Sequence, residues 1–323
     1  FMEPQAGGAC RAGNIYNLLQ RVLYRMAEQG QTEYAQIPVI SLNLMGEEKH
    51  TGFRITPGLL SGGIAAGCYG DLIMCLYQQV KPYEQNPGET DRIRSQVEKK
   101  LCESIRRHRN GRHTREKNYR YACEVFSKVP VKPGKKKRVG ITGEIYMKYS
   151  KLGNDDIESF LLRQGMEPYS GGFVNYCLYL VDTERYKAEK YQHNPIMAKA
   201  CAFVLHRLCE AQKHLLTVIG ETDRFQTDLP FPELKEKVQG ILAEGCNTGD
   251  GWLIAAEVIQ YVEKGCGSVL ILHPFGCLVS HVCERGILQR LHARFPDVSI
   301  QTIEYDYDQS KTLRESRILL AIS

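Results

Sequence analysis

Apolar positions in the first 130 residues recur mainly at the spacing of helices. Between residues 14 and 29 they fall every three or four positions, and Gly30 follows as a stop signal, so this pattern predicts an amphipathic helix. The same spacing predicts helices over 59–80 and 90–109. Only the run at 38–44 is typical of a buried strand, and a lone strand cannot form a stable sheet. We therefore expect partner strands, either undetected here or lying upstream in the natural chain.

A second pattern, in which strands alternate with helices, begins after a basic linker at 131–137. This alternation indicates a parallel sheet with helices on both faces, and such sheets bind ligands at the carboxyl ends of their strands. We predict an α/β fold of two Rossmann-like lobes with mostly parallel sheets. The first lobe (1–130) is helix-rich and short of strands, as if truncated, and the second spans 138–323. Its strands are expected at 138–144, 166–168, 268–273 and 298–304.

Composition places the chain among globular proteins of a reducing compartment. Its 323 residues suit about two domains, and no apolar run reaches the length of a membrane span. Residues 1–4 do not resemble a secretory signal. Twelve cysteines in a chain of this size favour free thiols over a disulfide framework, so we expect a cytoplasmic protein.

Positive charge is concentrated in one region, although the net charge is only +5. Arginines and lysines crowd residues 106–120, and more follow at 132–138. The pattern is typical of a solvated helix face followed by a basic linker. It also fits a surface that binds nucleic acid phosphates, or one that attracts an anionic substrate or an acidic partner.

Three cysteines lie in loops that lead into predicted helices. Cys277 follows the strand at 268–273 and precedes a helix, where the sheet edge and the helix dipole favour the thiolate that binds metal. Cys10 lies in a glycine-rich loop, and Cys246 lies in another loop before a helix. An incidental thiol is the alternative for each. Because there is no Cys-x-x-Cys pair, any metal cluster must be assembled from cysteines that are distant in sequence.

Short sequences along nearly the whole chain point to one family. The most specific are Gly-Asp-Gly-Trp at 249–252 and Pro-Phe-Gly-Cys at 274–277, taken together. In these two segments, and in several others, the chain resembles the large activase-related relatives of the 2-hydroxyacyl-CoA dehydratases. The other segments are Cys-Arg-Ala-Gly at 10–13, Pro-Val-Ile-Ser-Leu-Asn at 38–43, Tyr-Gly-Asp-Leu at 69–72, Lys-Pro-Tyr-Glu at 81–84, the stretch 137–146, Leu-Gly-Asn at 152–154 and Tyr-Asp-Tyr-Asp at 305–308.

This resemblance implies an iron–sulfur cluster, of the [4Fe-4S] or the double-cubane type, bound by cysteines on Rossmann-like domains. It also implies that an ATP-dependent activase delivers low-potential electrons. Cys10 and Cys277 carry over as metal ligands, and Cys246 is a weaker third candidate. The chain departs from the family where Gly-Gly-Ala-Cys replaces Cys-Gly-Pro-Cys at Cys10, and where His273 replaces a common Gln. An upstream cysteine region and the actin-like lobe of the activase are not in this sequence, so a complete cluster site is expected to need further residues.

Two other residues are candidates for catalysis. Glu144 follows a strand and a glycine, so it suits either a proton donor or the cap of a helix. His281, one turn after Cys277, suits a proton donor, a cluster ligand or an ordinary helix histidine. We expect an enzyme component that uses the cluster for reductive or radical dehydration of a 2-hydroxyacyl-CoA thioester.

The expected partners follow from that hypothesis. They are the activase, an acyl-CoA substrate and a second copy of the chain in a homodimer, with no membrane. Two alternatives stay open. One is a non-catalytic regulatory or assembly module of an activase-like protein, without its own cluster. The other, less favoured, is a nucleic-acid-binding protein that uses the basic stretch 106–138.

Overall fold

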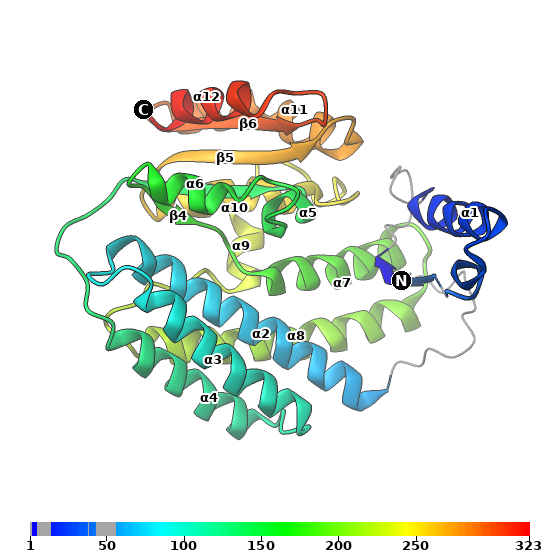
Figure 1. Cartoon of the computed structure of the whole chain (residues 1–323), viewed down its shortest axis with the longest axis horizontal. Helices are drawn as coiled ribbons and strands as arrows, with labels where there is room; N and C mark the ends of the chain where they lie inside the picture. The colour runs from blue at the N-terminus through cyan, green and yellow to red at the C-terminus, as the bar shows by residue number, and fades with distance from the viewer. Residues whose placement is uncertain (1, 5–13, 38, 43–55) are drawn as a thin grey trace.

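The structure is a computed structural model that describes residues 2–4, 14–37, 39–42 and 56–323. Its centre is a sheet of four parallel strands in the order β4-β3-β5-β6 (Figure 1). All four predicted strands of the second pattern are present, each with shifted ends. The strands are β3 (Arg138–Gly143), β4 (Glu167–Tyr169), β5 (Cys266–Pro274) and β6 (Ser299–Tyr305).

Helices cover both faces of this sheet, because its central strand is apolar on both sides. In β5, Leu270 and Leu272 join one buried cluster, whereas Val269 and Ile271 join the other. The period of two along a strand explains this division. The first cluster includes residues of α6 (Ile157–Arg163) and α12 (Lys311–Ile322), and the second includes residues of α10 (Gly251–Glu263) and α11 (Arg285–Arg294). The predicted α/β class, with a Rossmann-like parallel sheet, is confirmed.

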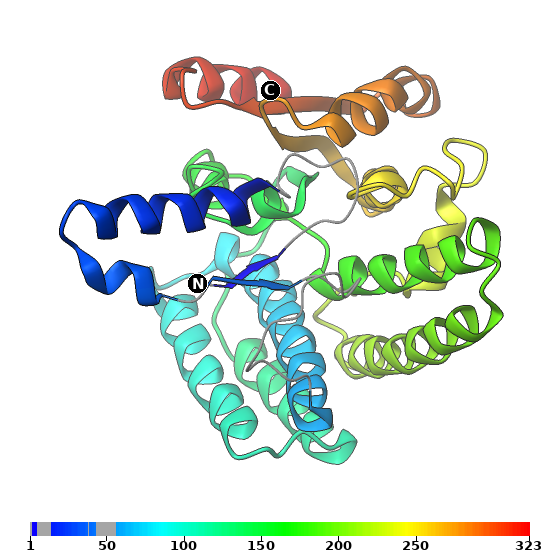
Figure 2. The ribbon, with the colours of Figure 1, turned by 90° about the vertical axis from the view of Figure 1, so that its right-hand side faces the viewer.

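Five long helices form a layer beside the sheet, below it in Figure 1. The predicted helices over 59–80 and 90–109 are present as the first two of them. The antiparallel α7 and α8 lie side by side (Figure 2). The five helices are α2 (Pro57–Val80), α3 (Glu89–Arg106), α4 (Arg112–Ser127), α7 (Phe173–Lys190) and α8 (Pro195–Gly220).

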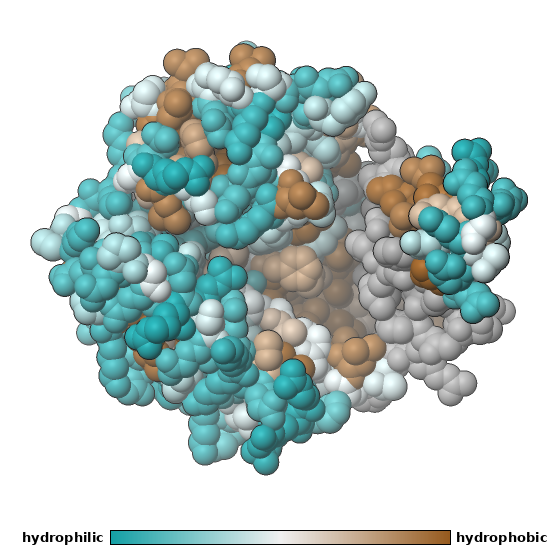
Figure 3. Space-filling view, in the orientation of Figure 1, coloured by the Kyte–Doolittle hydropathy of each residue, from teal (hydrophilic) through white to brown (hydrophobic). Residues whose placement is uncertain are grey.

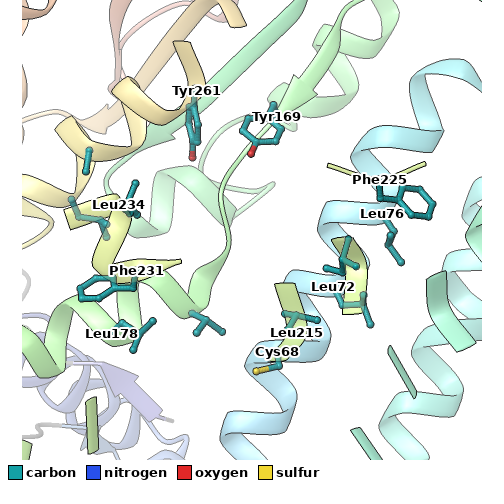
Figure 4. Packing of buried hydrophobic residues seen from close by; sticks show 14 of the residues in the cluster. Cys68, Leu72, Leu76, Tyr169, Leu178, Leu215, Phe225, Phe231, Leu234 and Tyr261 are labelled. Carbon is teal, nitrogen blue, oxygen red and sulfur yellow. The ribbon is translucent and has the colours of Figure 1, made fainter. Parts of the chain in front are cut away.

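One hydrophobic core crosses the linker at 131–137. Leu72 and Leu76 of α2 pack in the same cluster as Leu215 of α8 and Trp252 of α10. Figure 4 shows α2 facing α9 (Phe231–Lys237) and the Tyr169–Tyr261 pair across this cluster. The linker therefore separates two sequence patterns, but the residues on its two sides share buried packing.

The strand predicted at 38–44 has a partner that the sequence pattern did not reveal. β2 (Ile40–Leu42) pairs in parallel with β1 (Met2–Pro4). The predicted helix over 14–29 is present as α1 (Ile15–Glu28). The remaining short elements are η2 (Thr32–Gln36), η3 (Lys81–Tyr83), α5 (Ile145–Tyr149) and the π-helical η4 (Ser280–Glu284).

One described helix segment, Gly58–Tyr83, is long and apolar enough to cross a membrane by length and composition alone. Helices of soluble cores meet the same criterion, and Leu72, Leu76 and Val80 of this segment are completely buried in the shared core. The segment is therefore weak evidence for a membrane span.

Candidate functional site

The candidate site lies where the strand order reverses. The chain passes from β3 to β4 on one side and later returns to place β5 on the other side of β3. In open α/β sheets such a switch point leaves a crevice at the carboxyl ends of the two strands. Gly143 pairs with Leu272 in the last register position, and the Glu144 amide donates a hydrogen bond of 2.8 Å to the Leu272 carbonyl. The loops with Glu144 and Cys277 therefore leave the sheet at neighbouring points.

Gly143 permits this close approach of the two strand ends. Its φ is +129°, and a Cβ there would lie 2.0 Å from the Leu272 carbonyl oxygen. Replacement by alanine must shift β5 or distort the end of β3.

We expect Gly143→Ala to lower the free energy of unfolding by about 1–3 kcal/mol, the usual cost of a strained backbone. Urea denaturation measures this change. Gly267→Ala is the matched control in β5, because a Cβ at Gly267 meets no atom within 4 Å. Equal stability of the two variants would contradict the role of Gly143.

Cys277 lies partly buried in the turn between β5 and η4. Burial raises the pKa of its thiol, while hydrogen bonds with Ser280 act in the opposite direction. This differs from the expectation that the sheet edge and helix dipole favour the thiolate. The reason is that the sequence pattern gives the position of the loop but not how far the sulfur is withdrawn from water.

Two other cysteines lie in the same region. Burial, and then the charges of Cys246, Glu284 and Cys277, raise the pKa of Cys283 to about 11. Cys283 therefore lies close enough to Cys246 and Cys277 for their charges to act on it. Within the described ranges, however, no three His, Cys, Asp or Glu side chains are arranged to hold a metal ion. Cys10, the third predicted ligand, lies outside the described residues, so its proximity to Cys277 stays a prediction.

Three carboxyl groups converge beside Cys277. Glu284 is completely buried, its Oε1 accepts a 2.8 Å hydrogen bond from the Ser280 hydroxyl, and its Oε2 has no hydrogen-bond partner among the described residues. Burial, then repulsion from Glu144, raises the pKa of Glu284 to about 8. Burial also raises the pKa of Asp250 well above its usual range, with Glu144 and Glu284 as further causes.

Glu144 is the least buried of the three carboxyl groups. Its Oε2 accepts a hydrogen bond of 3.0 Å from the Met147 amide, so it caps α5, as one of the two sequence interpretations predicted. Burial still raises its pKa. All three carboxyl groups therefore have raised pKa values, which is typical of groups that exchange protons at functional sites.

Two histidines lie close to the Cys277 turn. His281 Nδ1 is 2.7 Å from the Cys277 carbonyl oxygen, and its Nε2 is 3.7 Å from the Glu304 carboxylate. The ring of His273, which is completely buried, packs edge-on against it with centroids 5.5 Å apart. Burial lowers the pKa of His273. His281 therefore contacts the backbone of the Cys277 turn, and its catalytic role stays a prediction.

Sequence reasoning missed Asp250, Glu284 and Ser280 as site residues. Asp250 was noted only within Gly-Asp-Gly-Trp, and this motif was its one detectable signal. Glu284 is the last residue of the wider π-helical turn η4, which lies between Cys277 and α11. No period in the sequence marks such a turn.

Apolar side chains are exposed around the crevice. Phe275 and Leu278 flank Cys277 and are 59% and 55% exposed, and Val282 follows at 63%. Figure 3 shows a hollow with hydrophobic residues between the part that holds the sheet and the helices below it.

The basic stretch lies on α3 and α4, in the helical layer (Figure 1). Several of its charges are already paired. Arg106 and Arg107 both bond Glu103, and Arg120 bonds Glu116 and Glu221. These pairs agree with the interpretation of a solvated helix face.

Comparisons with protein-family models, with curated proteins and with solved structures find no match to this chain.

Proposed function

We propose that the chain is an iron–sulfur protein of the type related to 2-hydroxyacyl-CoA dehydratases and their activases. In this proposal it is cytoplasmic and accepts low-potential electrons from an ATP-dependent activase for reductive or radical dehydration of an acyl-CoA substrate. The observation that carries the proposal is the position of Cys277, at the switch point of a parallel sheet and beside three carboxyl groups of raised pKa.

The described residues supply part of a ligand set. Cys277 and Cys246 offer free sulfur ligands, the donor type that iron–sulfur clusters use. Since no complete metal-holding group lies within residues 14–37 and 56–323, the remaining ligands would come from Cys10, from a second copy of the chain or from residues outside this sequence. A cluster bound here would supply one-electron transfer at low potential.

The carboxyl groups fit the proton chemistry of a dehydration. When the bond between carbon and the hydroxyl oxygen of a 2-hydroxyacyl thioester breaks, the hydroxyl must gain a proton to leave as water. Burial raises the pKa of Glu284 to about 8 and that of Asp250 well above its usual range, so both acids are suited to donate that proton. Protonated acids also leave less negative charge near an anionic cluster.

The test is anaerobic purification followed by iron and sulfide analysis and an EPR spectrum of the reduced protein. Brown protein with several irons and sulfides per chain, and an EPR signal on reduction, supports the proposal. Colourless protein that stays free of iron after anaerobic reconstitution would overturn it and favour the regulatory or assembly module.

A further inference from the structure

The strand β6 is the last strand on its side of the main sheet. Its one neighbour among the described strands is β5, so its other edge faces outward. Both views of the ribbon show β6 at the outer margin of the molecule, with α11 and α12 packed beside it (Figures 1 and 2). An edge of this kind presents backbone N–H and C=O groups with which a further strand can pair.

The hydrogen bonds between β5 and β6 show which backbone groups this edge presents. The Phe275 amide donates to the Tyr305 carbonyl oxygen at 2.9 Å, so Tyr305 faces β5. The residues of a parallel strand face its two sides alternately, and each residue directs its N–H and C=O groups to the same side. Ile300, Thr302 and Glu304 therefore direct these groups outward.

These outward groups are largely unpaired in the part of the chain that the structure describes. The Ile300 carbonyl oxygen lies 2.9 Å from Nε2 of His292, which covers one end of the edge. The outward groups of Thr302 and Glu304 have no comparable partner there. The seven residues of β6 contain neither proline nor glycine, so the edge is regular over its whole length.

The opposite edge of the sheet is protected against pairing. β4 has only three residues, and the Glu167 amide donates to the Lys137 carbonyl oxygen at 2.9 Å, so Glu167 and Tyr169 face β3. Pro168 therefore faces outward, where it offers no N–H. Short length and an outward proline both block an edge strand, and β6 has neither of them.

An apolar strip on α12 lies beside the free edge. Leu313, Leu319 and Leu320 are 55%, 40% and 78% exposed. Leu313 and Leu320 are seven residues apart, so they lie on the same side of the helix. Figure 3 shows hydrophobic residues at the outer margin over α12, the margin that β6 occupies in Figure 1. Arg317 lies between these leucines, and its long stem can pack while its charge turns to water.

We propose that the outer edge of β6 is a dimerisation surface, on which a second copy of this chain adds its own β6 in the antiparallel direction. The two four-stranded sheets then form one continuous sheet. The edge is complementary to itself. With Thr302 on the two-fold axis, its outward groups bond to those of the second Thr302, and Ile300 of each copy faces Glu304 of the other. No like charges face each other in this register.

The same pairing brings the two α12 helices into contact. α12 packs over both β5 and β6. Because paired strands are about 4.8 Å apart, a helix above the space between β5 and β6 comes within about 10 Å of its copy, the usual distance between packed helices. Leu313 and Leu320 then bury apolar surface that is exposed in the single chain.

This arrangement leaves each candidate site to its own chain. Antiparallel pairing places the carboxyl ends of the two β6 strands about 20 Å apart along the sheet. The crevice with Cys277 lies at that end of the neighbouring β5, so a copy bound through β6 does not reach it. The dimer therefore does not depend on the proposed cluster, and metal-free protein is sufficient to test it.

Sedimentation equilibrium at chain concentrations from about 1 to about 100 µM tests the proposal. We expect the wild type to form dimers in this range. Thr302→Pro removes the central outward N–H without removing a bond to β5, so it should raise the dissociation constant at least about tenfold. Thr302→Val is the matched control, because it keeps the N–H and the branched side chain, and it should still form dimers. A wild type that stays monomeric, or equal dissociation constants for the two variants, would overturn the proposal.

A second pair of variants covers the case in which Thr302→Pro does not fold. Leu320→Glu places a charge in the contact between the two α12 helices, and it should weaken the dimer while circular dichroism shows an unchanged fold. Leu152→Glu is its control, because Leu152 is 86% exposed and lies before α6, away from β6. Dimers equally strong in these two variants would count against the proposed surface.

Discussion

Cys277→Ala, purified without oxygen, is expected to lose most of the iron and sulfide of the wild type while keeping its fold. The physical reason is that a thiolate is the ligand of an iron–sulfur cluster and alanine offers no donor. Burial of Cys277 raises the cost of its thiolate in the metal-free protein, so bound iron must supply the compensating charge. Iron and sulfide content per chain, with the EPR spectrum, measures the loss, and circular dichroism checks the fold.

Cys102→Ala is the matched control for this experiment. Cys102 is an exposed free thiol on α3, in the helical layer and outside the crevice. Its removal should leave iron content unchanged. If Cys277→Ala retained as much iron as Cys102→Ala, the assignment of Cys277 as a ligand would be wrong.

Cys246→Ala tests whether Cys246 is a second ligand of the proposed cluster. Cys246 lies in the loop before α10, and its charge, like that of Cys277, raises the pKa of Cys283. If Cys246 is a ligand, its alanine variant should approach the loss seen for Cys277→Ala. If it only packs there, iron content should match that of Cys102→Ala, and the missing ligands must then come from elsewhere, such as Cys10.

The main sheet could be predicted because its strands have patterns that local rules recognise. The run at 268–273 is apolar without alternation, as a central strand buried on both faces must be, and it forms β5. β1 could not be predicted in the same way. Its three residues, Met-Glu-Pro, have no period, and their strand geometry comes from pairing with β2, which lies far along the chain.

The loop positions around the candidate site could be predicted, but the burial of its carboxyl groups could not. The loop positions of Glu144 and Cys277 follow directly from the strand ends and the parallel topology. The withdrawal of Asp250 and Glu284 from solvent depends on how η4 and the start of α10 pack over the sheet. Carboxylates are usually exposed, so the sequence alone gives no reason to expect raised pKa values there.

Lys148→Met is expected to destabilise the protein strongly. The Lys148 ammonium lies 2.8 Å from Glu257 Oε1 and 2.9 Å from Oε2, and both side chains are only 3% exposed. The Thr142 hydroxyl donates a further 2.5 Å bond to Glu257 Oε2. Removing only the cation leaves a buried carboxylate without its counter-charge, which costs about 3–5 kcal/mol. Urea denaturation measures the fall in the free energy of unfolding.

A comparison of charge states separates the lost ion pair from lost packing. Lys148→Met combined with Glu257→Gln removes both charges, so the double variant should be more stable than Lys148→Met alone. Lys128→Met is the surface control, because the Lys128–Glu124 pair is 70% and 63% exposed and should contribute less than about 1 kcal/mol. A Lys148→Met variant that is no less stable than Lys128→Met would contradict the contribution of the buried ion pair.

Lys148 also acts on the candidate site. Its positive charge lowers the pKa of Asp250, whereas the carboxylates of Glu144, Glu284 and Glu257 raise it. The residue that stabilises the fold through Glu257 therefore also influences the charge of Asp250.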